Sequence, residues 1–308
     1  MRKFILVLSL FIGSYALKAQ QELQVSQYMF NGLFLNPAYA GSHPYTSASI
    51  LHRRQWVSFP GAPVTYLASI DGPIKGKNMG LGFHASTDQI GLLNVTDAMV
   101  SYAYHIKTSE KGKLSLGIRA GVQNYRTDFG RLENIQDPND PIYQNNISLW
   151  IPKVGFGAYY YTDRFYAGLS LPTLWAYDRR NNASIDLERG SYLTRHYFIN
   201  AGYVFDINRN VKFKPSALLK IERSAPIQAD INANFLFNDR FWIGVGYRTN
   251  AEVMFMVEYW ISPNFRAGYA FDYSTNRIRG FSGGSHEIMI GFDFLSKLQN
   301  RIKNPRYF

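Results

Sequence analysis

The sequence contains no cysteine. A chain without cysteine forms no disulfide bond, has no thiolate nucleophile or cysteine-ligated zinc site, and cannot carry a lipid at an N-terminal lipobox. Its six histidines include no pair four residues apart beside a carboxylate at zinc spacing, so we expect no metal. No glycine-rich loop of the phosphate-binding kind is present, and we expect no cofactor.

Long apolar runs are also missing after residue 20, and the mean hydropathy is −0.21. The single long run, Phe4–Ile12, follows Arg2 and Lys3 and precedes a small residue, Ala19. A basic start, an apolar stretch of this length and a small residue predict a secretory signal peptide over residues 1–19. A membrane anchor is the disfavoured alternative, because a spanning helix needs about 20 apolar residues.

Clusters of one charge are absent too, although the net charge is +11. The lysines and arginines are spread along the chain, so the excess positive charge does not predict a nucleic-acid partner. For an exported basic protein we expect the anionic headgroups of outer membrane lipid, or glycan phosphates, as the counter-charge.

Aromatic residues, by contrast, are abundant. Tyrosine and phenylalanine occur 22 times each, and aromatics make up 16% of the chain. Such a content suits the aromatic girdles that flank the lipid-facing band of a membrane barrel.

Residues 251–274 carry the clearest pattern in the sequence. Apolar and polar residues alternate on both sides of Ser262–Asn264, which predicts a β-hairpin with one dry and one wet face. In a soluble sandwich the dry face would be core. In an outer-membrane barrel the dry face meets lipid and the wet face lines the lumen.

The same alternation recurs along the chain, which predicts an all-β, transmembrane, antiparallel up-and-down β-barrel of about 14 strands over residues 45–308. The outer membrane is the expected location. The predicted strands lie near residues 45–53, 64–70, 79–85, 98–106, 114–122, 154–160, 165–171, 197–205, 211–221, 227–237, 241–247, 253–261, 265–273 and 288–294.

Connection lengths favour the barrel over the sandwich. The three long connections, Phe129–Trp150, Pro172–Leu193 and Thr275–Gly284, all follow odd-numbered strands, whereas even-numbered strands are followed by short turns. Outer-membrane barrels sort their connections in this way, with short turns in the periplasm and long loops outside.

Residues 20–44 do not alternate and are predicted to be a separate, non-strand segment. Leu23, Tyr28, Met29 and Leu33–Leu35 fall loosely at helical spacing, and Asn36-Pro37 ends any helix there. We expect a short helical plug inside the barrel or packed beneath it.

Two blocks of sequence resemble a known family. Gln27-Tyr28-Met29, Asn36-Pro37-Ala38-Tyr39-Ala40-Gly41, Arg54-Gln55-Trp56 and Pro60–Thr65 resemble the N-terminal signature of the PorP/SprF family, outer-membrane β-barrels of the type IX secretion system. The residues taken as the signature, with a structural or partner-binding role, are Gln27, Tyr28, Asn31, Asn36, Pro37, Ala38, Gly41, Trp56, Pro60, Gly61 and Pro63.

The resemblance implies a function. It implies help in secreting or anchoring large cell-surface adhesins, associated with gliding motility. The partners it implies are periplasmic lipoproteins and ring components of the type IX secretion system and the secreted surface adhesin. No catalytic residue carries over, so the resemblance does not imply an enzyme. A general or solute-specific porin, an outer-membrane hydrolase and a passive structural anchor remain as alternatives.

The predicted lumen face carries charges on neighbouring strands. They form either a selective channel wall or a salt-bridged ladder that fills the lumen and grips the N-terminal segment, and buried charges that must be paired favour the ladder. The residues concerned are Lys212, Lys214, Lys220 and Glu222 beside Asp230, Glu252 and Glu258 beside Arg266 and Asp272, and Glu287 and Asp293 on the last strand.

Residues Gly280–Gly284 match the G-x-S-x-G pattern of hydrolases, with His286 nearby. A nucleophile elbow requires a turn from a strand into a helix. Here the pattern lies in a glycine-rich hairpin loop, so catalysis by Ser282 is disfavoured.

Overall fold

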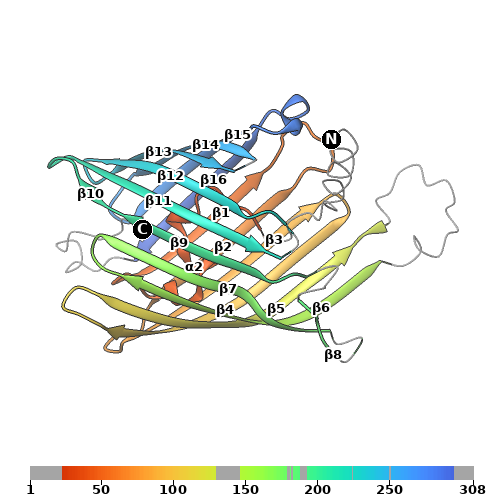
Figure 1. Ribbon diagram of the computed structural model, residues 1–308, viewed down its shortest axis with the longest axis horizontal. Helices are drawn as coiled ribbons and strands as arrows, with labels where there is room; N and C mark the ends of the chain where they lie inside the picture. Colours follow the sequence, from red (N-terminus) through yellow and green to blue (C-terminus); the bar gives the residue numbers. More distant parts are fainter. Residues whose placement is uncertain are drawn as a thin grey trace, which may run out of the picture.

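The computed structural model describes residues 23–129, 146–178, 181, 183–187, 193–223, 225–249 and 251–294. These residues form one closed antiparallel sheet, seen from the side in Figure 1. Its strands are β1 (Thr46–Arg54), β2 (Val64–Pro73), β3 (Met79–Ile90), β4 (Leu93–Lys107), β5 (Lys113–Thr127), β6 (Ile147–Tyr161), β7 (Phe165–Asp178), β9 (His196–Tyr203), β11 (Val211–Glu222), β12 (Gln228–Phe237), β13 (Phe241–Arg248), β14 (Glu252–Trp260), β15 (Phe265–Ser274) and β16 (Ser285–Phe294).

Each strand pairs with its neighbours in the chain, and the sheet closes where β1 pairs with β16, from Thr46 opposite Phe294 to Arg54 opposite His286. Two short pieces complete it. Strand β8 (Ala183–Ser184) pairs with the end of β7, and β10 (Phe205–Asp206) pairs with β11 beyond the end of β9. The predicted all-β barrel of about 14 strands is confirmed.

Several strands extend beyond their predicted ends, and two of these extensions shorten the long connections. Strand β6 begins at Ile147 and β7 ends at Asp178, so the connections expected at Phe129–Trp150 and Pro172–Leu193 are shorter than predicted. At this end of β6 the inward side chains Leu149 and Ile151 are buried in an apolar cluster with Ala176, while Trp150 on the outward face is apolar and exposed. Apolar residues thus lie on both faces, so the alternation is lost although the ladder continues to the pairing of Thr127 with Ile147. Alternation marks a strand only where its two faces differ in polarity.

The two faces of the sheet differ in burial as the alternation predicted. On β14 the side chain of Val257 is 36% exposed and points outward, whereas its neighbour Met256 is 2% exposed and points into the lumen. The outward face carries a continuous set of exposed aromatic and branched residues, which is the surface that a barrel presents to lipid.

The barrel has two unlike mouths. The connections at residues 74–78, 108–112, 162–164, 207–210, 238–240 and 261–264 form what we call the short-turn mouth. Those at residues 55–63, 91–92, 128–146, 179–195, 223–227, 249–251 and 275–284 form the long-connection mouth. The sorting matches the prediction, and the general rule for such barrels puts the short turns in the periplasm.

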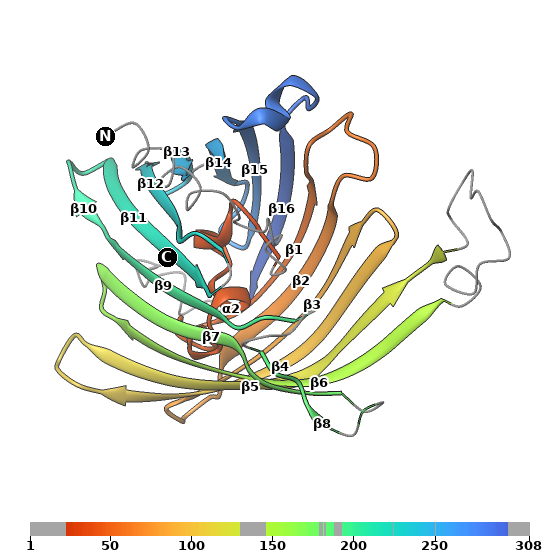
Figure 2. The ribbon, with the colours of Figure 1, turned by 45° about the vertical axis from the view of Figure 1, so that its right-hand side comes forward.

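Residues 23–44, which we call the lumen segment, run inside the barrel (Figure 2). The segment contains η1 (Tyr28–Phe30), α2 (Gly32–Leu35) and η2 (Pro37–Tyr39). As predicted, α2 ends at Asn36-Pro37. The Asn36 side chain accepts a hydrogen bond from the Ala38 N–H at 2.9 Å and so caps η2.

In the described part of the chain, no helix has the length and apolar character needed to cross a membrane. The predicted signal peptide over residues 1–19 lies outside the described residues and stays a prediction, as does the division of the chain at residue 19. The predicted barrel limit at residue 308 also lies outside them, since the description ends at Phe294.

Candidate functional site

The lumen segment threads the barrel from one mouth to the other. Its first residues contact the ends of β13 and β16 at the long-connection mouth, where Arg248 and Glu287 lie. Its last residues contact β2 and β3 near the short-turn mouth, where Gly41 meets Asp71 and Gly80. Because it is buried along most of its length, the barrel wall and the segment form one packed interior.

A carboxylate holds the start of the lumen segment. The two side-chain oxygens of Glu287 on β16 each accept a backbone hydrogen bond at 2.8 Å, one from Ser26 and one from Gln27. Bonds from N–H groups to a charged acceptor are about twice as strong as bonds between neutral groups. Glu287 therefore fixes the position of the backbone at the point where it enters the barrel.

Arg53 on β1 links this contact to the neighbouring strands. Its guanidinium forms ion pairs with Asp272 on β15, with Glu287 at 3.2 Å and with Glu252 at 3.6 Å, and it donates a hydrogen bond to the Ser26 hydroxyl at 2.9 Å. Ser26 in turn donates to Asp272 at 2.6 Å. The segment is thus a member of the ionic network and not merely covered by it.

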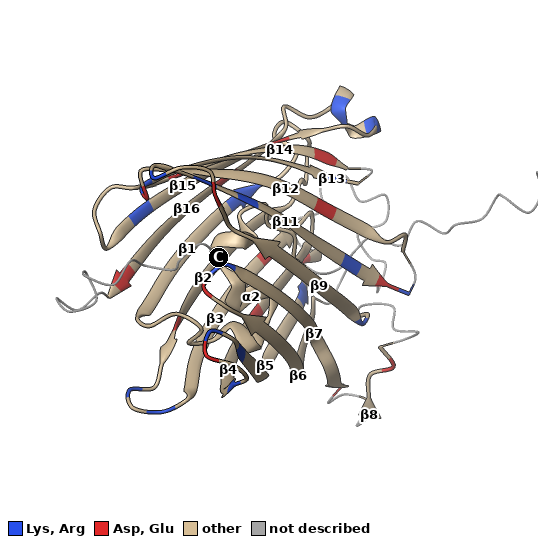
Figure 3. Cartoon of the chain, turned by 60° about the vertical axis from the view of Figure 1, so that its left-hand side comes forward, with Lys and Arg blue, Asp and Glu red and all other residues tan. Residues whose placement is uncertain are grey.

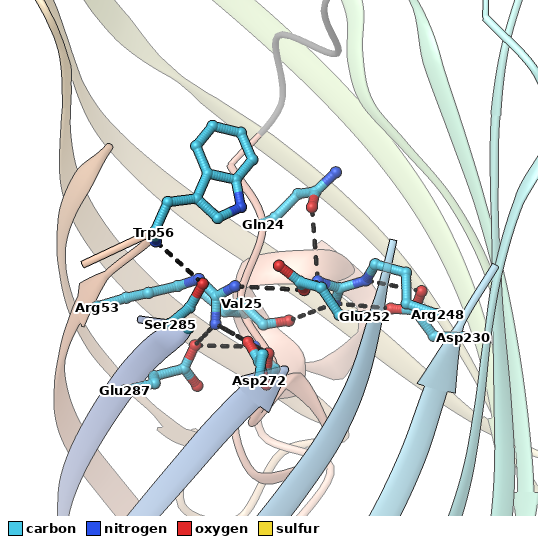
Figure 4. A network of polar contacts seen from close by, with 12 residues as sticks. Gln24, Val25, Arg53, Trp56, Asp230, Arg248, Glu252, Asp272, Ser285 and Glu287 are labelled. Atoms are coloured by element: carbon cyan, nitrogen blue, oxygen red, sulfur yellow. Dashed lines mark hydrogen bonds and ion pairs between the residues drawn. The ribbon is translucent and has the colours of Figure 1, made fainter. Parts of the chain in front are cut away.

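A second arginine continues the network, as Figure 4 shows. Arg248 on β13 pairs with Asp230 at 2.9 Å and with Glu252 at 2.8 Å, and it donates to the Val25 carbonyl at 3.3 Å. Lys220 reaches Asp230 at 3.5 Å. Burying charges of this number costs stability unless each is paired. Each of these side chains has an ion-pair partner, although Arg53 Nε and Asp272 Oδ1 make no hydrogen bond to any residue that the structure describes.

Neutral groups hold the middle of the lumen segment. The Asn31 side chain donates to the hydroxyls of Ser49 and Ser69 at 3.1 and 3.0 Å. On the opposite side of the lumen, the Asn232 amide donates to the Tyr28 hydroxyl at 2.7 Å. The segment is therefore fastened to both sides of the barrel.

Its backbone carbonyls are satisfied by the wall as well. Arg119 donates to the Phe34 carbonyl at 2.9 Å, and Ser170 donates to the Leu35 carbonyl at 2.6 Å. The first two contacts provide acceptor partners that the open end of so short a helix requires. In the reverse direction, the Asn36 side chain of the segment donates to the wall, to the Ala158 carbonyl on β6 at 2.9 Å.

Two glycines let the last part of the segment touch the wall directly. A Cβ at Gly117 would clash with the backbone of Ala38, and a Cβ at Gly80 would clash with the carbonyl of Ala40. Gly82 makes room for the lumen segment in the same way, since a Cβ there would meet the Leu33 side chain at 2.6 Å.

A small cavity lies beside the middle of the segment. This cavity of about 20 Å³ lies between Tyr28, Asn36 and Tyr39 of the segment and Tyr159 and Tyr166 of the wall. One water requires about 10–15 Å³ by this measure, so the cavity has room for about a single molecule.

The predicted lumen charges fall mostly on the expected face, but several partners differ. Lys220 pairs with Asp230 and Arg266 with Glu258 at 3.1 Å, as expected. Glu252 pairs with Arg248 and Arg53 instead of Arg266. Lys214 lies 5.6–5.8 Å from the rings of Phe30, Tyr166 and Trp242. Glu222 contacts His196 at 3.2 Å, and Lys212 contacts Asp239 at 2.7 Å.

The signature residues divide between two places. Gln27, Tyr28, Asn31, Asn36, Pro37, Ala38 and Gly41 lie in the lumen segment. Trp56, Pro60, Gly61 and Pro63 lie in the connection 55–63 at the long-connection mouth. Trp56 has a φ of 42°, rare for a bulky residue, and its N–H donates to the Ser285 hydroxyl at 3.2 Å. Figure 4 places Trp56 at the edge of the ionic network.

The sequence reasoning missed Arg53, Arg119 and Arg248. Arg53 lies near the end of β1, where the preceding inward residues are Ser49 and Leu51. Arg248 ends β13, whose other inward residues are Trp242 and two glycines. These uncharged neighbours gave no reason to predict a charged side chain on the inward face, and only the period-two position of each arginine indicated that it points inward. Both side chains share the parity of the buried face.

The G-x-S-x-G stretch has no catalytic geometry. It follows η4 (Arg277–Gly280) and leads into β16, so a strand and not a helix comes directly after Ser282. The Ser282 hydroxyl accepts from the Gly284 N–H at 3.0 Å, while His286 contacts the Tyr269 hydroxyl at 2.7 Å on the outward face. Within the described residues, no group of three or more histidine or acidic side chains is arranged to hold a metal ion.

Solved barrels are similar to this chain in overall form. A KdgM porin shares 11% identity at a TM-score of 0.41, covering 81% of this chain and 99% of that one. A Pseudomonas aeruginosa FadL homologue shares 10% at 0.48, covering 89% and 95%, and the CymD monoaromatic hydrocarbon channel shares 12% at 0.47, covering 89% and 94%. At these values nothing about ligands or transport passes to this chain.

A search of curated proteins finds no match. The model of one family, described as type IX secretion system membrane protein PorP/SprF, matches residues 17–292. That match spans most of the sequence, including both signature blocks and nearly all of the barrel, so the chain belongs to the PorP/SprF family of type IX secretion system membrane proteins.

Proposed function

We propose that this protein is a non-enzymatic component of the type IX secretion system that helps to secrete large cell-surface adhesins or to anchor them at the surface. In this proposal the barrel is a closed anchor and docking platform in the outer membrane, and the adhesin does not pass through its lumen. Its partners are periplasmic lipoproteins and ring components of the system and the adhesin itself.

The observation that carries the proposal is the lumen segment. In the described part of the chain the lumen segment packs against the wall of the fourteen-strand barrel, and the cavity between the segment and the wall at Tyr28 and Tyr159 measures about 20 Å³, which supports a lumen that is closed to a polypeptide. The segment is held by two buried arginines, by Glu287 and by close backbone contact at Gly80 and Gly117. Opening the lumen would break all of these contacts together.

The alternative of a general porin requires an open lumen. A porin would conduct ions after reconstitution into a planar bilayer, whereas a closed anchor would not. The passive structural anchor differs in another way, since it would not affect adhesin export.

The test removes residues 22–36 and keeps the preceding sequence. We expect a heat-modifiable, membrane-inserted barrel that no longer supports adhesin at the cell surface, measured with antibody on intact cells. Normal adhesin display from a well-folded truncated protein would contradict the proposal.

A second variant covers the case in which the truncated barrel does not assemble. Gly117→Leu places a side chain where the Ala38 backbone lies, and Gly280→Leu makes the same change where an added Cβ meets nothing within 4 Å. We expect loss of adhesin display in the first variant alone. Equal display in both would count against a role for the docked segment.

A further inference from the structure

A cavity of about 400 Å³ opens at the short-turn mouth. Its size falls within the range of about 300–1,000 Å³ that is common for ligand pockets. Its walls come from the turn 74–78, the turn 108–112 and the start of the turn 162–164, and its floor is the end of the lumen segment at Gly41–Pro44. The cavity lies apart from the ionic network, which is at the opposite mouth.

The lining of this cavity is strongly basic. Four lysines line it, Lys77, Lys107, Lys111 and Lys113, against a single lining carboxylate, Asp163. Within the described part of the chain, none of these four ammonium groups lies within 4.0 Å of a carboxylate in an ion pair. Elsewhere on the same mouth, Lys212 is paired with Asp239 and Arg164 with Asp206.

Two of the lysines face each other across the sheet. Lys107 on β4 is paired in register with Lys113 on β5, and both positions share the parity of the inward face, with His105 and Ser115. Like charges directly opposite on neighbouring strands are destabilising. An anion between them would remove that repulsion.

The position of the cavity argues against membrane lipid as its occupant. Its inner wall is formed by His105 and Tyr161, which point into the lumen, and the Lys113 ammonium lies 5.9 Å from the Tyr161 ring. Lipid headgroups surround the outside of a barrel, whereas this cavity opens inside the mouth. Figure 3 turns the short-turn mouth toward the viewer and shows basic segments on its turns.

The chemistry favours carboxylates over phosphate. All four cations are lysines, and the cavity lacks an arginine, whose planar fork gives bidentate phosphate recognition. Pro44, Pro73 and Tyr161 add apolar surface that a peptide backbone and side-chain stems would cover.

We propose that this cavity binds a carboxylate-rich peptide segment of a partner protein, gripped by Lys77, Lys107, Lys111 and Lys113. The proposal deepens the proposed function and rests on it for the nature of the partner, a periplasmic component of the secretion system. A peptide in the cavity would lie against His43 and Pro44, so the partner would touch the end of the lumen segment directly.

The test uses the full-length mature protein in phosphatidylcholine nanodiscs. The probe is a short fluorescein-labelled peptide of alternating aspartate and glutamate, and its binding is measured by fluorescence anisotropy at low and physiological salt. A peptide of the same length made of asparagine and glutamine is the neutral control. We expect binding of the acidic peptide only, weakened by salt.

The variants separate the cavity from the rest of the mouth. Lys107→Gln with Lys113→Gln should weaken binding by about tenfold or more, because several charges act on one ligand as a network. Lys212→Gln with Arg240→Gln removes the same charge from the opposite side of the mouth and should change the affinity by less than about twofold.

Several results would overturn the proposal. They are no binding of the acidic peptide, equal weakening by both double variants, or equal displacement by millimolar inorganic phosphate, which would make the cavity a simple anion site. Since the assay needs no secretion, a negative result here leaves the adhesin-display experiment to decide the proposed function, and a failure of that function leaves the peptide measurement standing.

Discussion

Replacing Arg53 by methionine tests the ionic network that holds the lumen segment. Methionine keeps most of the volume and removes the charge. The change leaves Asp272 with only the Ser26 hydroxyl as a described hydrogen-bond partner, while Glu287 keeps its two backbone N–H groups and Glu252 keeps Arg248. All of these side chains are buried, so solvent cannot compensate.

Breaking a buried ion pair from one side costs about 3–5 kcal/mol, because the remaining charge stays buried without its partner. We expect a loss of this size for Arg53→Met, measured by urea unfolding in phospholipid vesicles with tryptophan fluorescence. The matched control is Arg54→Met. Arg54 is the next residue on β1, is exposed and faces the other way, and its loss should cost no more than about 0.5 kcal/mol.

A rescue experiment identifies the cause. Adding Asp272→Asn to Arg53→Met removes the uncompensated charge and should recover part of the lost stability. The reasoning would be refuted if Arg53→Met were no more harmful than Arg54→Met. It would also be refuted if the second change added its own full cost.

Three further predictions concern the barrel. In the same unfolding assay, Val257→Arg should destabilise the barrel by about 2–4 kcal/mol if the site lies near the bilayer midplane, while Val257→Leu should not. Equal effects of the two substitutions would mean that Val257 does not face lipid. On intact cells, a cysteine at Gly283 should react with an impermeant maleimide and cysteines at Asn78 and Asn210 should not, and the reverse pattern would invert the orientation. In planar bilayers, Gly117→Leu should raise the ion conductance above that of the wild type and of Gly280→Leu. If none of the three proteins conducts ions, the segment tolerates the added side chain.

The barrel could be predicted because its physics is repeated in every strand. Alternation with a period of two identified each strand, and the parity of loop lengths sorted its two mouths. Strand ends could not be predicted as well, as at Ile147 and Asp178, because apolar side chains lie on both faces of the sheet near these ends, so the alternation is lost while the hydrogen-bonded ladder continues.

The site was predicted only in outline. The absence of alternation in residues 20–44 indicated a plug, and the charges on the inward face indicated a ladder that could grip it. The ion-pair partners of Glu252 and Arg53 depend on how β1 pairs with β16 when the barrel closes. The register of that pairing cannot be predicted from the sequence pattern. The contact of Ala38 with Gly117 required the path of the segment itself.

The same path changes one expectation about the lumen face. Met256, which points inward, would be expected to tolerate arginine better than Val257 does if the lumen were wet. In the structure Met256 packs in an apolar cluster with Tyr28, Met29 and Phe34 of the lumen segment. A charge there would be buried without a partner, so both substitutions should be harmful.

The measurement that tests the central claim most directly locks the lumen segment in place. The natural sequence has no cysteine, so Asn31→Cys with Ser49→Cys places one thiol on the segment and one on β1, at side chains that are hydrogen-bonded at 3.1 Å from Asn31 Nδ2 to Ser49 Oγ. Formation of the disulfide is checked by a reductant-sensitive gel mobility, and the two single variants are the controls. Adhesin display on intact cells is then compared with and without reductant. If the barrel is a closed anchor, the locked protein displays the adhesin as well as the reduced one; loss of display under oxidation, restored by reductant, would mean that the lumen must open for export.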